Sequence, residues 1–435
     1  MTHLLVSPWI PLTILVGLTV YARSTQGSWL APSAFAGLVW SLYVLLPLAV
    51  APEFPVSALG VWVILALISS LQAGAFLMEG RPAVHSPQER RIEEPLLLKR
   101  ILRVVLVSAL LATVGVVYHT WRSLGQYGLS FSGGDLIALG SLLSEARYSG
   151  ENEPLAVRLL VMWVHPAALL GGMAYVLAKT RRAKLISFSP FVPAFLLATV
   201  VAARAGTLVA ACCWLGGFLA MKAYGTSGTH RIFTRNTVIF ASITGIVVIG
   251  FIELIGMIRG KTWDQEFEVS DSWIALKAGL LGYLAVFSDW VTHGEHWSLG
   301  LGAYTFAGLF NITGLHAREI GIYSTSITLA GGEETNIYTA FRGLIQDFSL
   351  PGAVLFSFLA GLLSGLVYGR VCRGRWRSTL ALSALYAFLA WSPVISLATY
   401  NSLLLAWVVA AIVFYWSRVL APEPRKSLGV LRQQA

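Results

Sequence analysis

The sequence predicts an all-α membrane protein that crosses the bilayer about eleven times. Of its 435 residues, 56% are hydrophobic and only 12% are charged, and the mean hydropathy is +0.70. A soluble globular domain carries about 25% charged residues, so this chain has too little charge to cover a water-facing surface. Its apolar residues also recur in stretches of about 20, the length of a helix that spans the hydrocarbon core. These observations exclude a soluble enzyme, a disulfide-stapled scaffold and a disordered chain.

The expected spans follow one another with charged residues mostly between them. We expect membrane helices at residues 4–21, 29–50, 56–78, 101–121, 155–178, 186–203, 205–221, 237–257, 349–369, 379–398 and 401–418. The first stretch lacks a basic start and a cleavage site, so we interpret it as a retained span. The whole chain, 1–435, then forms a single integral membrane domain. Its three cysteines give no plausible disulfide or metal site.

The distribution of basic residues predicts which ends of the helices face the cytoplasm. Basic residues in short loops stay on that side. Arg23 and five segments hold 22 of the 31 Lys and Arg and only 5 of the 21 acidic residues; the segments are 79–103, 179–184, 222–235, 370–377 and 418–435. This asymmetry accounts for the net charge of +10, so the charge gives no reason to expect a nucleic-acid partner. The C-terminus is predicted inside and, with an odd number of spans, the N-terminus outside.

Two segments on the predicted outer side are too long to be simple connectors. They are 122–154 and 258–348, and loops of that length are usually functional or disordered. Within the second, residues 273–291 are apolar at helical spacing. A full crossing there would place the arginines of 370–377 outside, so we expect a helix on the outer interface.

Ionisable residues on the outer side are the candidates for function, because polar groups at a membrane are costly. Arg204 lies among small residues between two expected spans, in VVAARAGTLV. It is either an arginine that extends to the interface or a ligand for an anion. Arg147 and Arg318 add two guanidinium groups on the same side, each of which is also compatible with an ordinary loop residue. Arg122 and Arg158 lie at span ends and are interpreted as anchors.

The segment 331–352 is the densest polar stretch before a span. It reads GGEETNIYTAFRGLIQDFSLPG, and its Gly pair followed by acids and a threonine is typical of a helix start. At helical spacing Glu334, Tyr338 and Arg342 are successive neighbours, and an acid four residues before a base is stabilising. The segment is therefore either a solvated helix held by side-chain pairing or part of a site at the membrane mouth.

Histidines give a weaker signal on the same side. His316 lies two residues before Arg318, and a histidine can accept a proton from a hydroxyl near neutral pH; a surface histidine is the alternative. THGEHW at 292–297 has no third matched ligand, whereas zinc sites use three or four. We therefore expect no metal.

The stretch from 335 to 369, TNIYTAFRGLIQDFSLPGAVLFSFLAGLLSGLVYG, resembles the C-terminal hallmark of the Wzy group of bacterial O-antigen polymerases, which join oligosaccharide repeat units. In that family an Asn–x–Tyr–Thr segment precedes an acidic–Phe–Gly turn that enters an apolar helix; here the turn is Asp347–Phe348–Ser349. The arginine of VAARAGTL, the arginine of LLSEARYSG and a long loop before the hallmark occur in the same order. The layout matches over most of the chain, and 335–369 is its specific part.

The resemblance implies a glycosyltransferase in the bacterial inner membrane that acts at the periplasmic face. It implies a glycan on undecaprenyl diphosphate as donor, a second lipid-linked repeat unit as acceptor, inversion at the anomeric carbon, and no metal or other cofactor. Membrane lipids surround it, and a chain-length regulator is a protein partner to consider. The two outer segments become periplasmic loops.

Chemical reasoning assigns roles under this hypothesis. A departing diphosphate needs preorganised cationic donors, for which we expect Arg204, Arg342, Arg318 and Arg147. The acceptor hydroxyl needs a base, with Glu334 expected first and His316 and Asp347 behind it. Asn336 and Tyr338 are expected to bind sugar or phosphate oxygens.

Two other functions fit parts of the sequence. An O-antigen ligase uses the same donor and passes the glycan to lipid A–core. A flippase for lipid-linked oligosaccharides would need charged residues inside its spans and usually has repeated halves. The nearly uncharged spans favour a catalyst with its site at one face.

Overall fold

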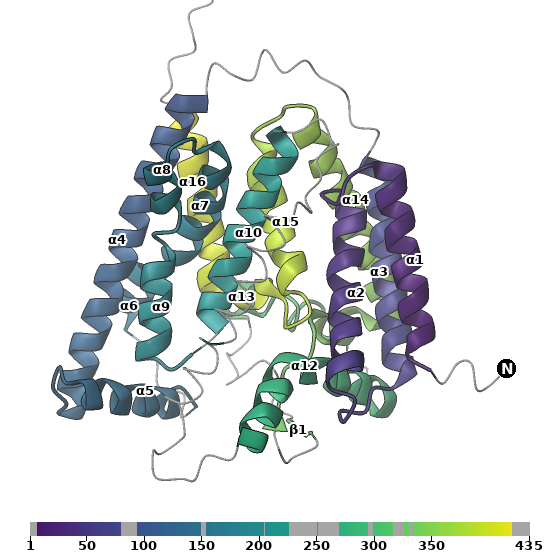
Figure 1. Cartoon of the computed structure of the whole chain (residues 1–435), viewed down its shortest axis with the longest axis horizontal. Coiled ribbons are helices and arrows are strands. Elements are labelled where there is room, and N and C mark those ends of the chain that lie inside the picture. The colour runs from purple at the N-terminus through teal and green to yellow at the C-terminus, as the bar shows by residue number, and fades with distance from the viewer. Residues whose placement is uncertain are drawn as a thin grey trace, which may run out of the picture.

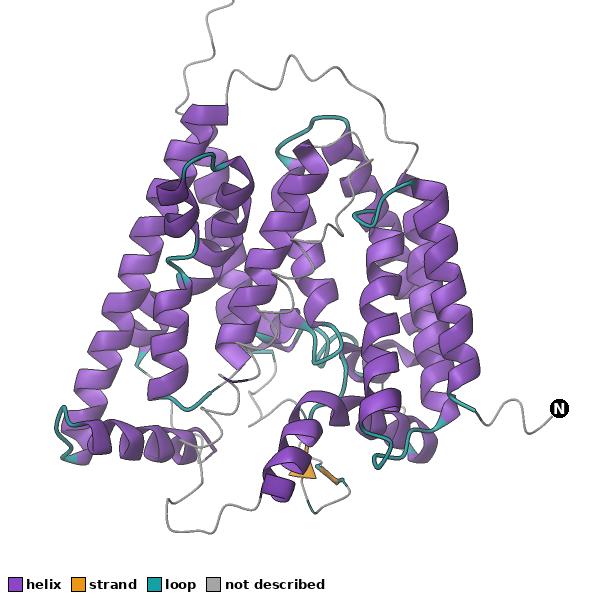
Figure 2. Ribbon diagram, in the orientation of Figure 1, coloured by secondary structure: helices purple, strands orange, loops and turns teal. Residues whose placement is uncertain are grey.

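The computed structural model of the chain is built almost entirely from helices (Figures 1 and 2). It describes residues 7–79, 94–148, 154–203, 205–225, 269–294, 299–315 and 334–419, together with 250, 323, 326–329 and 332. The described elements are α1 (Trp9–Gln26), α2 (Pro32–Val50), α3 (Ala58–Glu79), α4 (Glu94–Tyr127), α5 (Gly133–Tyr148), α6 (Leu155–Val161), α7 (Val164–Leu177), α8 (Arg181–Ser187), α9 (Phe191–Val200), α10 (Ala205–Gly225), α12 (Val269–His293), α13 (Ala307–Thr313), β1 (Ile327–Thr328), β2 (Glu334–Thr335), α14 (Ala340–Cys372), α15 (Ser378–Trp391), the 3₁₀-helix η2 (Leu397–Thr399) and α16 (Asn401–Val419).

Helix length and composition confirm an all-α protein suited to a membrane. Seven described segments are long and apolar enough to cross a bilayer: 32–50, 58–79, 97–127, 155–177, 181–200, 205–224 and 340–372. Two further apolar helices, 378–391 and 401–412, are shorter. Each lies within or overlaps an expected span, and α1 overlaps the first one. The expected span at 237–257 lies outside the described residues, apart from position 250.

The helix ends that border the basic segments lie together at one face of the bundle. In Figure 1 this face is at the top, and it holds the ends of α1, α3, α10 and α16, the start of α4 and the turn between α14 and α15. We call it the basic face. The first residue of α1, the ends of α2 and α4, and helices α5 and α12 lie towards the opposite face. The predicted alternation of helix direction is therefore present in the fold, and which face meets the cytoplasm stays a prediction.

Small residues let the helices approach until their backbones touch. On α3 and α14, a Cβ added at Gly74 or Gly361 would overlap a carbonyl oxygen of the other helix. Gly172 of α7 and Gly217 of α10 are pressed against each other's helices in the same way. Without a hydrophobic force between helices in lipid, close packing of this kind holds bundles together.

Two expected spans are interrupted where proline removes a backbone donor. The span at 155–178 is split into α6 and α7 at residues 162–163, ahead of Pro166. The span expected at 379–398 ends as α15 at Trp391, two residues before Pro393, and continues as a non-helical segment and η2. Both were expected as continuous helices, and the structure corrects them.

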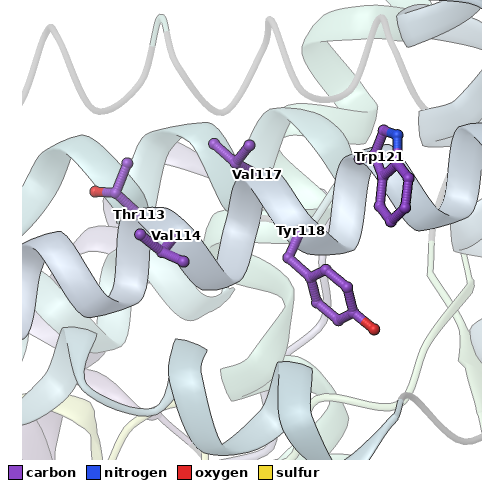
Figure 3. A pocket seen from close by; sticks show the side chains of 5 residues that line it. All are labelled: Thr113, Val114, Val117, Tyr118 and Trp121. Carbon is purple, nitrogen blue, oxygen red and sulfur yellow. The ribbon is translucent and has the colours of Figure 1, made fainter.

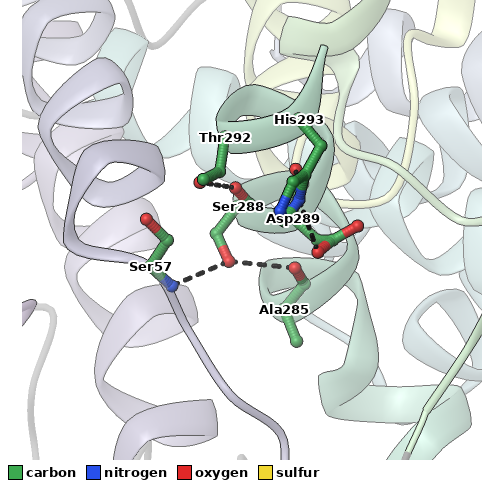
Figure 4. Close-up of polar contacts among 6 residues, drawn as sticks. All are labelled: Ser57, Ala285, Ser288, Asp289, Thr292 and His293. Atoms are coloured by element: carbon green, nitrogen blue, oxygen red, sulfur yellow. Dashed lines mark hydrogen bonds and ion pairs between the residues drawn. The ribbon is translucent and has the colours of Figure 1, made fainter.

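The helix expected at 273–291 is present as α12, with bonds to the α2–α3 connection. Ser288 accepts a hydrogen bond from the backbone N–H of Ser57 over 3.0 Å and donates one to the carbonyl of Ala285 over 2.9 Å (Figure 4). Lys277 forms an ion pair with Glu53, and this bond lowers the pKa of Glu53. The hydroxyl of Tyr283 donates to the carbonyl of Tyr43 over 2.7 Å. These contacts fix α12 against α2 and α3; its place at a lipid interface remains a prediction.

The expected outer segments contain regular structure of their own. Residues 122–154 include the end of α4 and the whole of α5, which lies across the end of α4 in Figure 1. Near the start of α5, the backbone N–H of Ser130 donates a hydrogen bond to the Asp135 carboxylate, and hydrogen bonding by Ser130 lowers the pKa of Asp135.

In the second outer segment, Glu334 pairs with Thr328 and Thr335 with Ile327 in a short antiparallel ladder. The helical interpretation is therefore wrong for 334–339, because residues 334–335 form β2, 336–339 are not helical and the helix begins at Ala340.

Candidate functional site

The start of α14 is set by the chain on both sides of it. The Thr339 side chain accepts a hydrogen bond from the N–H of Phe341 over 3.3 Å, as an N-cap threonine does. The N–H of Ala340 donates to the carbonyl of Ser392, beyond the end of α15, over 2.8 Å. The indole N–H of Trp40 reaches the Ser392 hydroxyl over 3.0 Å and its ring stacks on Phe341. The first turn of α14 is thus tied to α2 and to the break after α15.

Arg342 occupies an aromatic corner in that first turn. Its guanidinium carbon lies 3.8 Å from the ring centre of Tyr338, 4.0 Å from that of Tyr323 and 5.4 Å from that of Trp290. The two tyrosine rings are inclined at 73°, so they form a corner instead of a parallel sandwich. Only 6% of Arg342 is exposed. Such stacking is worth up to about 2 kcal/mol when the cation is desolvated. We call these four residues the Arg342 cluster.

The cluster joins elements that are far apart in the sequence. Trp290 comes from α12, Tyr323 from the region before β1, and Tyr338 and Arg342 from the entry to α14. The hydroxyl of Tyr323 lies against Gly343, where a Cβ would come within 3.1 Å of it. Burial raises the pKa of Tyr323, an effect that the nearby charge of Arg342 opposes. Its phenol therefore stays protonated at neutral pH and available as a donor.

Asp347 holds a backbone turn instead of facing open space. It is fully buried, and its two carboxylate oxygens accept hydrogen bonds from the N–H groups of Tyr304 and Thr305 over 3.1 and 2.6 Å. In return the N–H groups of Gly300 and Leu301 donate to the carbonyls of residues 346 and 347. Hydrogen bonds to a carboxylate are among the stronger ones in proteins. This geometry gives Asp347 a positioning role for the turn at 299–306; its role as a base stays a prediction.

Helix α14 is kinked at Ser349, two residues after Asp347. Ser349 has φ 61° and ψ 172° within α14, a backbone region that glycine occupies far more readily than other residues. Pro351 two residues later lacks the N–H that a continuous helix would need. The kink leaves the carbonyls of residues 346 and 347 to the turn at 299–306. This is the position where the resembled family usually has glycine.

Of the other predicted site residues, the structure describes some and leaves others outside its described part. Asn336 is exposed between β2 and α14, while Tyr338 is buried in the Arg342 cluster. Glu334 lies in β2 and Arg147 lies near the end of α5, but their side chains are outside what the structure describes. Arg204, His316 and Arg318 also lie outside the described residues. The described part of the predicted site thus consists of Asp347, the exposed Asn336 and the contact between Tyr338 and Arg342.

Sequence reasoning missed how the aromatic residues are used. Trp290 contacts Arg342, and the ring of Tyr304 stacks on that of Tyr323 with centres 6.2 Å apart; neither contact was predicted. Tyr323 gave no local signal, because its partners are 15 or more positions away in the sequence.

Two hollows on the outward flank of α4 contain none of the predicted site residues. One, of about 320 Å³, is lined by Thr113, Val114, Val117, Tyr118 and Trp121 (Figure 3). The other, at the α4–α5 corner, includes Trp121 and Arg122. The first has no charged side chain in its lining, so we place the candidate site at the Arg342 cluster.

Comparison with known proteins adds no relative. No protein-family model, no curated protein and no solved structure matches the chain.

Proposed function

We propose that the protein is a membrane glycosyltransferase that polymerises oligosaccharide repeat units linked to undecaprenyl diphosphate. The acceptor sugar hydroxyl attacks the anomeric carbon of the donor, and its C–O bond forms as the bond to diphosphate breaks. The hydroxyl proton passes to a base, and undecaprenyl diphosphate leaves with the bonding electrons. Attack opposite the leaving group inverts the anomeric centre.

The buried guanidinium of Arg342 is the observation that carries the proposal. A guanidinium keeps its charge in a water-poor site and forms two parallel hydrogen bonds to phosphate. Stacking on Tyr323 and Tyr338 restricts its orientation before a ligand arrives. Preorganised charge of this kind stabilises a leaving anion without further reorganisation. In the proposal, Arg204, Arg318 and Arg147 add to this charge.

Glu334 is the proposed base. Glu334 lies eight residues before Arg342, and its backbone is held by pairing with Thr328. A carboxylate can accept the hydroxyl proton. His316 is the second candidate. Asn336, exposed between β2 and α14, is proposed to bind sugar oxygens. Asp347 is given the positioning role described above.

The arrangement of buried charge favours a catalyst over a transporter. In the described helices the buried Lys, Arg, Asp and Glu residues are Glu79, Arg342 and Asp347. Glu79 lies at the basic end of α3, whereas the other two share the first turns of α14. A translocation path would be expected to carry polar groups through the bundle. Periplasmic action in the inner membrane is part of the proposal.

Reconstitution of the purified full chain with lipid-linked repeat units tests the proposal. We expect a ladder of products on a gel, with equal intensity in the presence and absence of EDTA. Transfer of glycan to added lipid A–core without a ladder would assign the ligase reaction instead. Absence of product with either acceptor would contradict a glycosyltransferase.

A further inference from the structure

Two buried polar groups beside Asp347 have no explanation in the fold. Gln346 is 6% exposed, and its side-chain carbonyl oxygen meets no hydrogen-bond donor among the described residues. Thr305 is 4% exposed, and its hydroxyl likewise has no partner in that part of the chain. Buried polar groups in native proteins are nearly always bonded, so each exception needs a reason.

Both groups are held in place by backbone contacts. Gln346 directly precedes Asp347, and its carbonyl accepts the N–H of Gly300 over 3.0 Å. Thr305 donates its N–H to Asp347, and its carbonyl accepts the hydroxyl of Ser396 over 2.9 Å. The backbone at each residue is therefore fixed while the side-chain oxygen remains unused. This is how a preorganised binding group differs from one that merely fills space.

Gln346 also lies one helical turn after Arg342. Residues four apart in a helix are neighbours on the same face, and the segment from 340 to 347 is buried throughout. An amide carbonyl and a hydroxyl are suited to hydroxyl groups, which donate and accept in turn. A ligand with phosphate at Arg342 and hydroxyl groups next to it matches the sugar diphosphate of the proposed function.

We propose that Gln346 and Thr305 form a subsite for the sugar attached to the diphosphate, with Gln346 accepting a hydrogen bond from a sugar hydroxyl. This inference rests on the proposed function, since it places the diphosphate at Arg342. A sugar hydroxyl at this place would give both polar atoms the partner that they lack among the described residues. The two residues thereby select for sugar and not for the lipid.

The variants Gln346→Met and Thr305→Val test the subsite, because each removes the polar atom and nearly keeps the shape. Gln72→Met is the matched control: Gln72 is equally buried, and its side-chain oxygen likewise meets no donor among the described residues. Its amide nitrogen, however, donates to the Ser33 carbonyl over 3.0 Å and to the Thr19 hydroxyl over 3.4 Å, and methionine loses these bonds. We expect equal or higher Tm for the two subsite variants and lower Tm for the control. Gln346→Glu keeps the acceptor oxygen and should retain binding better than Gln346→Met.

Binding of two ligands to the full chain separates the possible outcomes. Undecaprenyl diphosphate carrying the repeat unit should bind about tenfold more weakly to each subsite variant, and sugar-free undecaprenyl diphosphate should bind them as it binds wild type. Equal binding of the sugar-bearing lipid by variants and wild type, or a lower Tm with unchanged binding, overturns the subsite alone. If wild type binds neither lipid, the proposed function and the subsite fall together.

Discussion

The two segments of α14 on either side of Ser349 differ in what their burial achieves. The segment from 350 to 372 buries a stripe of small residues at helical spacing, Ala353, Ser357, Gly361, Ser364 and Gly365, while Leu355, Leu359 and Leu363 are exposed. The segment from 340 to 347 is buried on all sides, yet it contains Arg342, Gln346 and Asp347. One segment is built to pack in lipid and the other keeps costly polar groups. In our account the first supports the second, and function lies in the second.

The strongest test of this comparison is to break the packing segment. A Cβ at Gly361 would overlap the carbonyl oxygen of Leu71 and lie 2.9 Å from the N–H of Ala75. Gly361→Leu should therefore force α3 and α14 apart and lower the free energy of unfolding by about 3 kcal/mol. Thermal unfolding followed by tryptophan fluorescence measures the change.

Gly17→Leu is the matched control, because a Cβ at Gly17 meets nothing within 4 Å. Its Tm should stay near that of wild type. Equal Tm values for the two variants would show that the close α3–α14 contact does not stabilise the protein.

Asp347→Asn tests the connection between the polar segment and the turn at 299–306. Asparagine offers one acceptor oxygen where Asp347 uses two, so the N–H of Tyr304 or Thr305 loses its buried partner. We expect a loss of about 2 kcal/mol and reduced activity, since the turn no longer holds its place. Asp289→Asn, at an acid whose side chain is 48% exposed, should change neither property. Full stability with lost activity would instead make Asp347 a chemical participant.

Ser349→Gly tests the kink between the two segments, and we expect it to stabilise the protein by removing backbone strain. Glycine adopts φ 61° without the steric cost that serine pays, so we expect a gain of about 1 kcal/mol. Ser349→Val should lose at least as much. Ser357→Gly, in the regular part of the same helix, should be destabilising. A lower Tm for Ser349→Gly would contradict the assigned backbone geometry.

The Glu53–Lys277 ion pair should give the smallest effect, below about 1 kcal/mol, because it is partly exposed. The folded-state pKa of Glu53 lies below its ordinary value of 4.5. Its contribution is therefore present above pH 4.5 and is lost as the pH falls through the lowered folded-state pKa. The Tm difference between wild type and Glu53→Gln should vanish in acid. A difference that persists there would assign it to something other than this charge.

Hydropathy predicted most of the membrane-spanning helices, but it predicted little of the polar contacts around Arg342 and Asp347. The spans could be predicted from the sequence because a lipid-facing helix needs a long apolar stretch, whatever other helices it packs against. The breaks near Pro166 and Pro393 were missed, although proline is a local signal, because tertiary contacts decide whether a proline bends a helix or ends it.

The prediction of a helix start in the segment 331–339 was wrong for a different reason. The segment's glycines, acids and Thr335 resemble a helix start, but Thr339 is the residue that caps α14, and Glu334 pairs with Thr328, six residues upstream. Residue type and position were enough to select Arg342 as a candidate. Its partners Trp290 and Tyr323 could not be predicted, because contacts across 52 and 19 positions leave no local pattern.

Ladder formation by Arg342→Ala in reconstituted membranes tests the central claim most directly. Removing a preorganised donor to a developing anion costs about 10² to 10³ in rate, so we predict that the ladder disappears in correctly inserted protein. Arg158→Ala, which removes an exposed arginine on α6, should leave it intact. A wild-type rate of ladder formation by Arg342→Ala would contradict the account.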